Sequence, residues 1–374
     1  MEKILITRKQ FISIAAGTLA LAGITGYSVS DKSNYIRSES EADMGKTSLT
    51  ADERAILYLA SLAPSGHNTQ PWFVNYIEPY HWIIGNDKNK WLPGVDPTQR
   101  ETMLSIGAFL QNLEYAAGNL GYDCDFVLLA ASSQEENVME VRLVRSTVRV
   151  YDIEKIRQRR TVRSHYRNEV LKKEDIKFLI GNDEDNIHFI PNTSTQCQWL
   201  SEQTLEANRI QSYRDAAQKE LSEWIRFSSI DAEKYLDGLT MAGMEIEGIF
   251  GWYLRNFYGK EDVMKKGFRE QSIDKVSKQV AQSAGWILIT SKDDSVASLL
   301  ETGKRMERLF LNVREKNIAL HPMTQVLEEA STNQILPGSV GLSQPVQFIL
   351  RVGYLKNYPE PVSLRRPVER FLRV

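Results

Sequence analysis

The chain has 374 residues, of which 42% are hydrophobic and 25% charged, with a formal net charge of −2. These values are ordinary for a soluble globular protein of one or two domains. They argue against a nucleic-acid partner, because that binding depends on clustered cations that neutralise phosphates. Two cysteines, Cys124 and Cys197, are too few for a disulfide framework and have no metal-ligand spacing. We expect both to be small core residues, with a single disulfide as the alternative.

The N-terminus has the pattern of an export signal. Arg8-Lys9-Gln10-Phe11 precedes an apolar stretch that ends near Ala22, too short for a comfortable membrane span. The Arg-Lys pair resembles a twin-arginine signal whose second arginine is lysine. We therefore predict a signal over 1–27, a disordered linker over 28–48 and a periplasmic location. The alternatives are an N-terminal amphipathic helix and a cytoplasmic location. Any contact with a membrane is expected through this signal or anchor alone.

Residues 49–149 show alternating helix and strand signals and form a first predicted unit. Thr50 and Glu53 are spaced as a capping box for a helix that ends before Pro64. A long, largely apolar helix is predicted over 103–120, with Gly121 in the C-cap position. The other apolar segments predict strands over 72–77, 81–84, 125–129 and 139–144.

Residues 150–374 form a second predicted unit with a similar order of elements. Helices are expected over 174–180 and 296–316, and strands over 187–190, 285–290 and 346–353. A helical region is expected over 195–280. Its part from about 212 to 278 has no counterpart in the first unit and is rich in aromatic residues. This insertion is either a lid over a site or an apolar helical subdomain. The repeated order suggests a duplicated fold.

Several common sites are absent from the sequence. It contains no G-x-G-x-x-G after a strand, no Walker loop, no H-E-x-x-H and no C-x-x-C. The five histidines are scattered, without a pair at helical ligand spacing. We therefore expect no metal site.

Two segments have unusual chemistry. Pro64-Ser65-Gly66-His67-Asn68-Thr69-Gln70-Pro71-Trp72 ends a helix with a turn and offers backbone and side-chain hydrogen bonds to a planar polar edge. Arg159-Arg160-Thr161-Val162-Arg163 combines forked cationic donors with a hydroxyl, a set suited to phosphate. Taken alone, composition favours reading the first segment as a helix stop and a turn before a strand, and the second as a solvated basic turn.

Together, the two segments resemble the flavin-binding motifs of nitroreductase-like proteins. Pro-Ser-x-x-Asn-x-Gln-Pro-Trp is similar to the nitroreductase segment that contacts the flavin ring from the neighbouring subunit. Arg-Arg-Thr-Val-Arg resembles the segment that holds the FMN phosphate and ribityl chain. With Asp96-Pro97-Thr98, Gln344-Pro345-Val346-Gln347 and Arg365-Arg366-Pro367, residues 51–374 resemble the Acg-type branch. In that branch two nitroreductase units are fused in one chain.

The resemblance implies an α+β, nitroreductase-like fold in which two half-units form an intramolecular pseudo-dimer. It implies one FMN per chain, because each unit carries only one of the two motifs. The expected cofactor-binding residues are Pro64, Ser65, Gly66, Asn68, Arg159, Arg160, Thr161, Arg163, Met323 and Arg365. Met323 is included because His321-Pro322-Met323-Thr324-Gln325 matches the position of the loop beside the flavin in the family. The alternative is that this segment is a structural helix terminus. No side chain is assigned a separate catalytic role.

The function expected from the resemblance is that of an FMN-dependent oxidoreductase. A small-molecule donor of the NAD(P)H type would reduce the flavin, and hydride would pass through flavin N5 to a small nitroaromatic or quinone-like acceptor. The alternative is a flavin-binding or flavin-sequestering protein with little turnover, favoured by an exported location where NAD(P)H is scarce. A helical interaction protein without a cofactor is a third hypothesis. A fused pseudo-dimer needs no second copy, so we expect a monomer.

Overall fold

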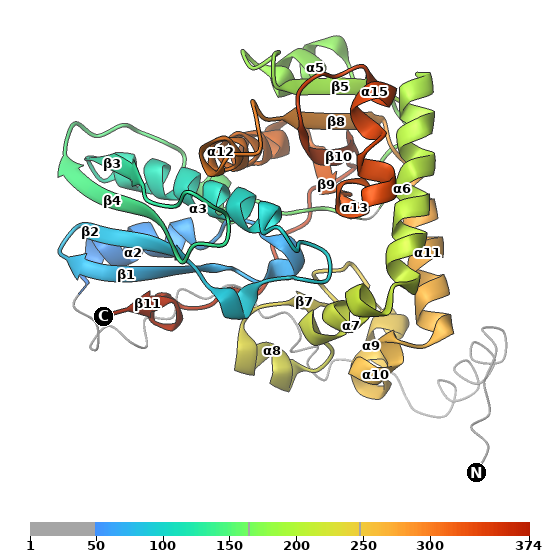
Figure 1. Ribbon diagram of the computed structural model, residues 1–374, viewed down its shortest axis with the longest axis horizontal. Coiled ribbons are helices and arrows are strands. Elements are labelled where there is room, and N and C mark those ends of the chain that lie inside the picture. Colours follow the sequence, from blue (N-terminus) through green and yellow to red (C-terminus); the bar gives the residue numbers. More distant parts are fainter. Residues whose placement is uncertain (1–48, 164, 247) are drawn as a thin grey trace. The chain divides into compact units, whose positions relative to one another are not determined.

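A computed structural model describes residues 49–163, 165–246 and 248–374. The predicted signal and linker, 1–48, lie outside the described residues. In the described part, helices and strands are mixed and the two main sheets are mostly antiparallel (Figure 1). The chain therefore has the α+β class that the sequence predicts.

The first sheet is built from strands within residues 72–145 and a strand at the end of the chain. Its strand order is β11-β1-β2-β4-β3, and only the β11–β1 pair is parallel. Figure 1 shows β11, which ends the chain, beside β1. The strands are β1 (Trp72–Glu78), β2 (His81–Asn86), β3 (Tyr122–Leu128), β4 (Asn137–Arg145) and β11 (Leu372–Arg373).

Two helices cover this sheet. Helix α2 (Ala51–Ala60) begins at the predicted capping box, in which Thr50 Oγ1 accepts from the Glu53 amide at 3.2 Å. One Glu53 carboxylate oxygen, Oε2, accepts from the Thr50 amide at 2.8 Å, and the other, Oε1, accepts from the indole of Trp82 at 3.3 Å. The capping residue therefore also connects α2 to β2. Helix α3 (Arg100–Asn119) is followed by Gly121 with φ +78°, the left-handed position that the sequence predicts.

The second sheet is built from strands within residues 187–354 and is antiparallel, with order β5-β8-β10-β9. Its strands are β5 (Ile187–Pro191), β8 (Gly285–Thr290), β9 (Ile318–Pro322) and β10 (Val346–Tyr354). Strand β9 was not expected. It contains His321, which the sequence placed in a loop after the long helix. Near this sheet lie α5 (Lys173–Ile180), α12 (Val296–Asn312), α13 (Gln325–Glu328), α14 (Ala330–Asn333) and α15 (Leu336–Val340). Helix α4 (Glu154–Gln158) packs against α12.

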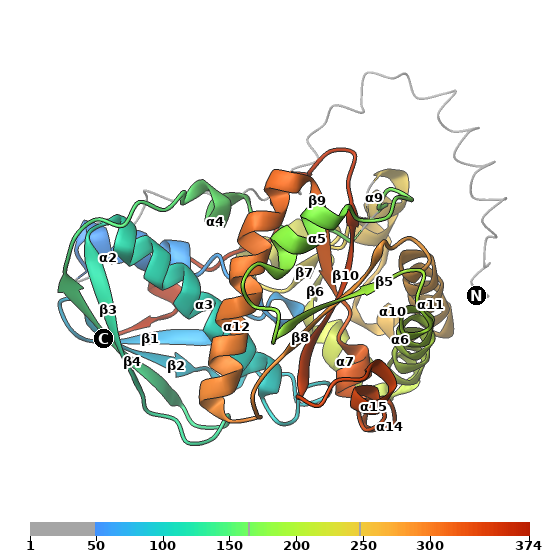
Figure 2. The same ribbon diagram turned by 90° about the horizontal axis from the view of Figure 1, so that it is seen from above.

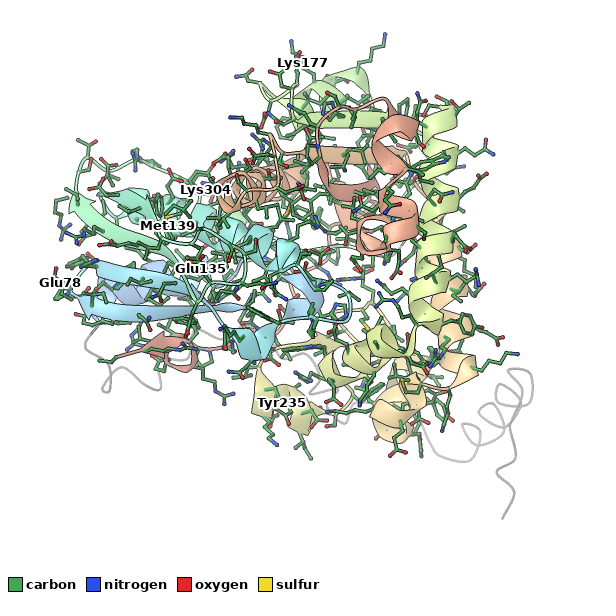
Figure 3. The ribbon with its side chains drawn as sticks, viewed as in Figure 1. Glu78, Glu135, Met139, Lys177, Tyr235 and Lys304 are labelled. Atoms are coloured by element: carbon green, nitrogen blue, oxygen red, sulfur yellow. The ribbon has the colours of Figure 1, made fainter. Side chains whose placement is uncertain are left out.

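Helices α3 and α12 lie between the two sheets and cross each other (Figure 2). Their backbones meet where Gly107 faces Gly303, so close that a Cβ on Gly303 would lie 2.0 Å from the Leu104 carbonyl oxygen. At the flank of this contact Lys304, labelled on α12 in Figure 3, donates to Glu114 of α3 at 3.1 Å. The core cluster of buried side chains runs continuously from the first sheet through these helices to the second.

The region between β5 and β8 is helical, as expected, apart from a small parallel pair of strands. Helices α6 (Thr195–Tyr213) and α11 (Lys266–Val280) pack side by side, next to the second sheet (Figure 1). Between them lie α7 (Asp215–Trp224), β6 (Ile225–Arg226), α8 (Ser229–Tyr235), β7 (Leu239–Thr240), α9 (Gly248–Phe257) and α10 (Lys260–Val263). We call residues 212–278 the insert.

Candidate functional site

The two chemically unusual segments meet at one cavity with a volume of about 60 Å³. The C-terminal tail and the insert complete its wall. The cavity is lined by Pro64, Ser65, His67, Asn68, Arg159, Thr161, Arg163, Gly238, Leu239, Thr240, Gly243, Ser363 and Arg365. Seven of the ten residues expected to bind a cofactor therefore line the same cavity, although they lie up to 301 positions apart in the chain.

The turn after α2 has an unusual backbone. His67, Asn68 and Gln70 have φ values of 47°, 54° and 54°, a left-handed conformation that costs free energy for residues other than glycine. Side-chain hydrogen bonds hold it: Ser65 Oγ accepts from the Gln70 amide at 2.9 Å, and Asn68 Nδ2 donates to the Gly238 carbonyl at 3.0 Å. Backbone strain of this kind is concentrated at functional sites.

The arginine segment is extended, and alternate side chains face the cavity. Arg159, Thr161 and Arg163 line it, whereas Val162 is buried on the other side in a cluster with Tyr166 and Leu355. Period-two alternation is what an extended chain produces. Three residues of the motif are thus presented together to one space.

Arg159 is 4% exposed and has unused hydrogen-bonding capacity. Its Nη2 donates to the Leu62 carbonyl at 3.3 Å, and its Nε lies 3.6 Å from Glu307 Oε1, an ion pair too long for a hydrogen bond. Among the described residues, Nη1 and Nε of Arg159 have no hydrogen-bond partner. Buried polar groups are normally satisfied, so a cation of this kind on a cavity wall indicates an anionic ligand.

The C-terminal tail brings a second guanidinium to the same place. Arg365 donates through Nη2 to the carbonyls of Leu62 and Ala63, both at 3.0 Å, and through Nη1 to Asn68 Oδ1 at 2.7 Å. Arg159 and Arg365 thus share the Leu62 carbonyl at the end of α2. The neighbouring Arg366 donates to the Trp72 carbonyl at 3.1 Å and fixes the tail to β1.

Three of the expected cofactor-binding residues do not line the cavity. The guanidinium of Arg160 contacts Glu245, at 3.3 Å, and the carbonyl of Glu360. Gly66 lies under Leu92, whose Cδ1 would be 3.1 Å from a Cβ at that position. Met323 is 1% exposed and packs in the core of the second sheet.

Other cavity residues were missed by the sequence analysis. His67 stands inside the first motif, but histidine there has no obvious role in a turn. Burial, and the charge of Arg163, lower its pKa to about 4, against an opposing effect of Glu101, so its imidazole is neutral at pH 7. Gly238, Leu239, Thr240 and Gly243 come from the insert, and Ser363 from the tail. No local sequence pattern marks these five.

A cluster of carboxyl groups surrounds Glu101, whose charge also acts on His67. Burial and the charge of Glu101 raise the pKa of Asp96 to about 7 and that of Glu328 to about 8. Arg100 pairs with Glu101 at 3.0 Å, and Thr324 Oγ1 donates to Glu328 at 2.7 Å. Within 49–163, 165–246 and 248–374, no group of three or more His, Cys, Asp and Glu side chains has the geometry to hold a metal ion.

Cys124 and Cys197 are both free thiols, the first half-buried and the second buried. Burial raises the pKa of Cys124 to about 12, so this thiol is not a thiolate at neutral pH. Both behave as small packing residues. In the described part of the chain no helix combines the length and the apolar character needed to cross a membrane.

The chain is similar in sequence to proteins named as NAD(P)H nitroreductases. It is 24% identical to PigM of Serratia sp. over 332 residues, which cover 84% of this chain and 91% of PigM. It is 21% identical to Acg of Mycobacterium tuberculosis over 355 residues, covering 88% of this chain and 98% of Acg. The resemblance indicated by the two motifs is therefore confirmed over most of the chain.

The other comparisons add less. No family model matches the chain. A crystal structure of a nitroreductase-like family protein from Bacillus cereus has a TM-score of 0.33 and 12% identity, covering 61% of this chain and 98% of that one.

Proposed function

We propose that this chain is an FMN-dependent oxidoreductase of nitroreductase type and that the cavity holds the phosphate and ribityl end of the cofactor. The observation that supports this most strongly is the convergence of Arg159, Arg163 and Arg365 on one small cavity, with Arg159 Nη1 left without a hydrogen-bond partner among the described residues. The sequence similarity to PigM and Acg supports the reaction class.

The charges at the cavity suit a phosphate monoester. Three arginines, Arg159, Arg163 and Arg365, line the cavity, and no carboxylate is among its lining residues in the described part of the chain, so its wall has an excess of positive charge. A phosphate monoester carries about −1.5 to −2 charges at pH 7, which would neutralise this excess. The hydroxyls of Ser65, Thr161, Thr240 and Ser363 also line the cavity and suit a polyhydroxyl chain.

The volume of the cavity sets a further condition. About 60 Å³ is several times what a single water molecule needs, enough for a phosphate-sized group. Pockets for ligands of the size of a flavin are roughly 300–1,000 Å³. We therefore propose that side chains at the cavity wall rearrange when FMN binds.

Bound FMN supplies the hydride chemistry between an NAD(P)H-type donor and a small nitroaromatic or quinone-like acceptor. The role of this chain's own residues is then to bind and orient. Arg159 and Arg365 would neutralise phosphate, and Thr161 would donate to ribityl oxygens. Arg163, at the far end of the same face, would stabilise negative charge that develops on the adjacent ligand. His67, neutral at pH 7, can give or accept one hydrogen bond at the cavity wall.

A flavin-binding or flavin-sequestering protein with little turnover is the second candidate. It is favoured by the export-type N-terminus, because we propose a periplasmic location, where NAD(P)H is scarce. The insert supports it too, since Gly238, Thr240 and Gly243 close one side of the cavity. Mixing the FMN-loaded protein with NADPH in a stopped-flow instrument separates the two: bleaching of the flavin within seconds identifies the oxidoreductase, and its absence identifies the binding protein.

The binding proposal is tested by titrating the purified chain with FMN and following the visible absorption spectrum. We expect Arg159→Ala to weaken FMN binding by about 1.5–3 kcal/mol, the scale of a charged hydrogen bond, with little effect on riboflavin, which has no phosphate. Arg209→Ala is the control, because Arg209 is exposed on α6 and pairs only locally with Glu206. A wild-type chain that takes up no FMN would overturn the proposal.

A further inference from the structure

The insert lines the cavity and is also hydrogen-bonded to the turn after α2 and to the arginine segment. The Gly238 amide donates to the Asn68 carbonyl at 3.0 Å, and Gln70 Nε2 donates to the Leu236 carbonyl at 2.9 Å. On the arginine segment, Arg163 Nη1 donates to the Gly243 carbonyl at 2.9 Å. The insert is therefore part of the site's framework in this structure.

Glu245 is the charged residue through which the insert reaches the arginine segment. Its Oε1 accepts from the Arg163 backbone amide at 3.0 Å and from Arg160 Nη2 at 3.3 Å. The side chain is only 6% exposed. Its backbone has φ +56°, a left-handed conformation that costs free energy for glutamate. Burial and strain at one residue indicate that this contact is held in place by its surroundings.

The position of Glu245 explains why Arg160 does not face the cavity. A single carboxylate oxygen binds the Arg160 side chain and the backbone amide three residues later, and so spans the segment from outside. Arg159, Thr161 and Arg163 are left on the inner face. The carbonyl of Arg163 is held as well as its amide: it accepts from Gln279 at 2.8 Å and from Arg351 at 2.9 Å.

We infer that Glu245 is a positioning residue of the anion site: by holding Arg160 and the Arg163 amide, it orients Arg159, Thr161 and Arg163 toward a bound phosphate group. This inference rests on the proposed function for the identity of the ligand as FMN. The orienting role itself applies to any phosphate-bearing ligand of the cavity. Preorganised donors bind more tightly because less conformational entropy is lost on binding.

If Glu245 served only as an ion-pair partner between the insert and the core, its variants would behave differently. The negative charge of Glu245 opposes the binding of an anion, so removing that charge alone should leave phosphate affinity unchanged or raised. A positioning role requires the acceptor oxygen rather than the charge. Glu245→Gln and Glu245→Ala remove the same charge, and only glutamine keeps an acceptor for the Arg163 amide. The difference between the two variants therefore measures positioning.

The experiment uses the full chain and three probes: FMN, riboflavin and inorganic phosphate, titrated by calorimetry. We expect Glu245→Gln to bind FMN and phosphate at least as tightly as wild type. Glu245→Ala should bind both at least about ten-fold more weakly than Glu245→Gln, the loss of roughly one hydrogen bond. Riboflavin affinity should be the same in all variants. Glu233→Ala, an exposed residue of the same insert, is the matched control.

Arg160→Ala provides a second line if Glu245→Ala does not fold. It should weaken phosphate binding and leave riboflavin affinity unchanged, because it removes one of the two groups through which Glu245 holds the segment. Equal phosphate affinity of Glu245→Ala and Glu245→Gln would overturn the inference, as would an equal loss for riboflavin. Phosphate binding without FMN binding by the wild-type chain would overturn the proposed function alone, and binding of neither would overturn both.

Discussion

Among single residues, Glu328 gives the clearest dependence on pH. It lies at the end of α13, where Gln211 Nε2 donates to it at 2.5 Å and Thr324 at 2.7 Å. Burial, and then the charge of Glu101, raise its pKa to about 8. A carboxyl group whose pKa is higher in the folded than in the unfolded state keeps its proton longer when folded. Its contribution to stability is complete below the unfolded pKa and is lost as the pH rises through the folded pKa.

Glu328→Gln should therefore flatten the pH dependence of stability in the alkaline direction. The wild-type free energy of unfolding should fall between pH 5 and pH 9, and the variant should lose less, by on the order of 3 kcal/mol. Urea unfolding at the two pH values measures the difference. Glu270→Gln is the control, because Glu270 is exposed on α11 and pairs only with Lys266. Parallel pH profiles of wild type and Glu328→Gln would show that Glu328 titrates normally.

At the scale of elements, α3 and α12 cross with their backbones in close contact. A Cβ on Gly107 would lie 2.2 Å from the Leu300 carbonyl oxygen, and one on Gly303 would lie 3.0 Å from the Gly107 Cα. Backbone atoms form this contact, and they cannot rotate away as a side chain can. Glu307 of α12 is fully buried at this crossing. Its Oε1 accepts a hydrogen bond from Asn112 Nδ2 of α3 at 3.0 Å and forms an ion pair with Arg159. Helix spacing thus sets the position of a cavity residue.

Gly303→Ala should destabilise the chain by about 2 kcal/mol or more, because the added methyl group forces the helices apart. This loss outweighs the gain of about 1 kcal/mol that alanine normally brings to a helix. Chemical denaturation followed by tryptophan fluorescence measures it. Gly267→Ala on α11 is the matched control: a Cβ there meets nothing within 4 Å, so stability should stay level or rise. A Gly303→Ala protein as stable as that control would mean that the helices separate without cost.

The sequence predicted those elements whose pattern is local. Apolar periodicity identified α3 and α12, and Gly121 has the left-handed φ of a helix-ending glycine, one residue after the C-cap Leu120. Strand β9 was missed because it has only five residues and follows closely after a long helix. A segment that short has too few residues for its alternation to stand out from the apolar pattern of the helix. Strand β11 has two residues and exists only through its pairing with Val74 and Asn75. A strand of that kind has no signal of its own.

In the candidate site, too, residues in local motifs were predicted and residues placed by tertiary contacts were not. The two motifs identified Ser65, Asn68 and the alternate residues of the arginine segment, all of which line the cavity. Sequence reasoning could not tell which arginines face inward, because that depends on Glu245, more than 80 residues away. Thr240, in the two-residue strand β7, and Ser363, in the tail, stand in no recognisable motif, and only tertiary contacts bring them to the cavity.

For the whole molecule, the path of the chain determines how many cavities of this kind can form. The site needs the turn after α2, the arginine segment after the first sheet, and Arg365 from a tail that returns to β1. The chain has one C-terminal tail, and its sequence contains each motif once. In the second unit, β5 ends at Pro191 and leads through Asn192-Thr193 into α6, without the Ser-x-x-Asn-x-Gln-Pro-Trp pattern.

We therefore expect one FMN per chain, on a monomer of 42.7 kDa. Flavin released by denaturing the saturated protein, measured by its absorbance against the protein concentration, should give a ratio near one. Light scattering coupled to size exclusion gives the mass of the same sample. Arg365→Ala should lower the affinity without changing the ratio, because it removes one donor from a single site. A ratio near two would mean that the second unit forms its own site from residues other than these motifs.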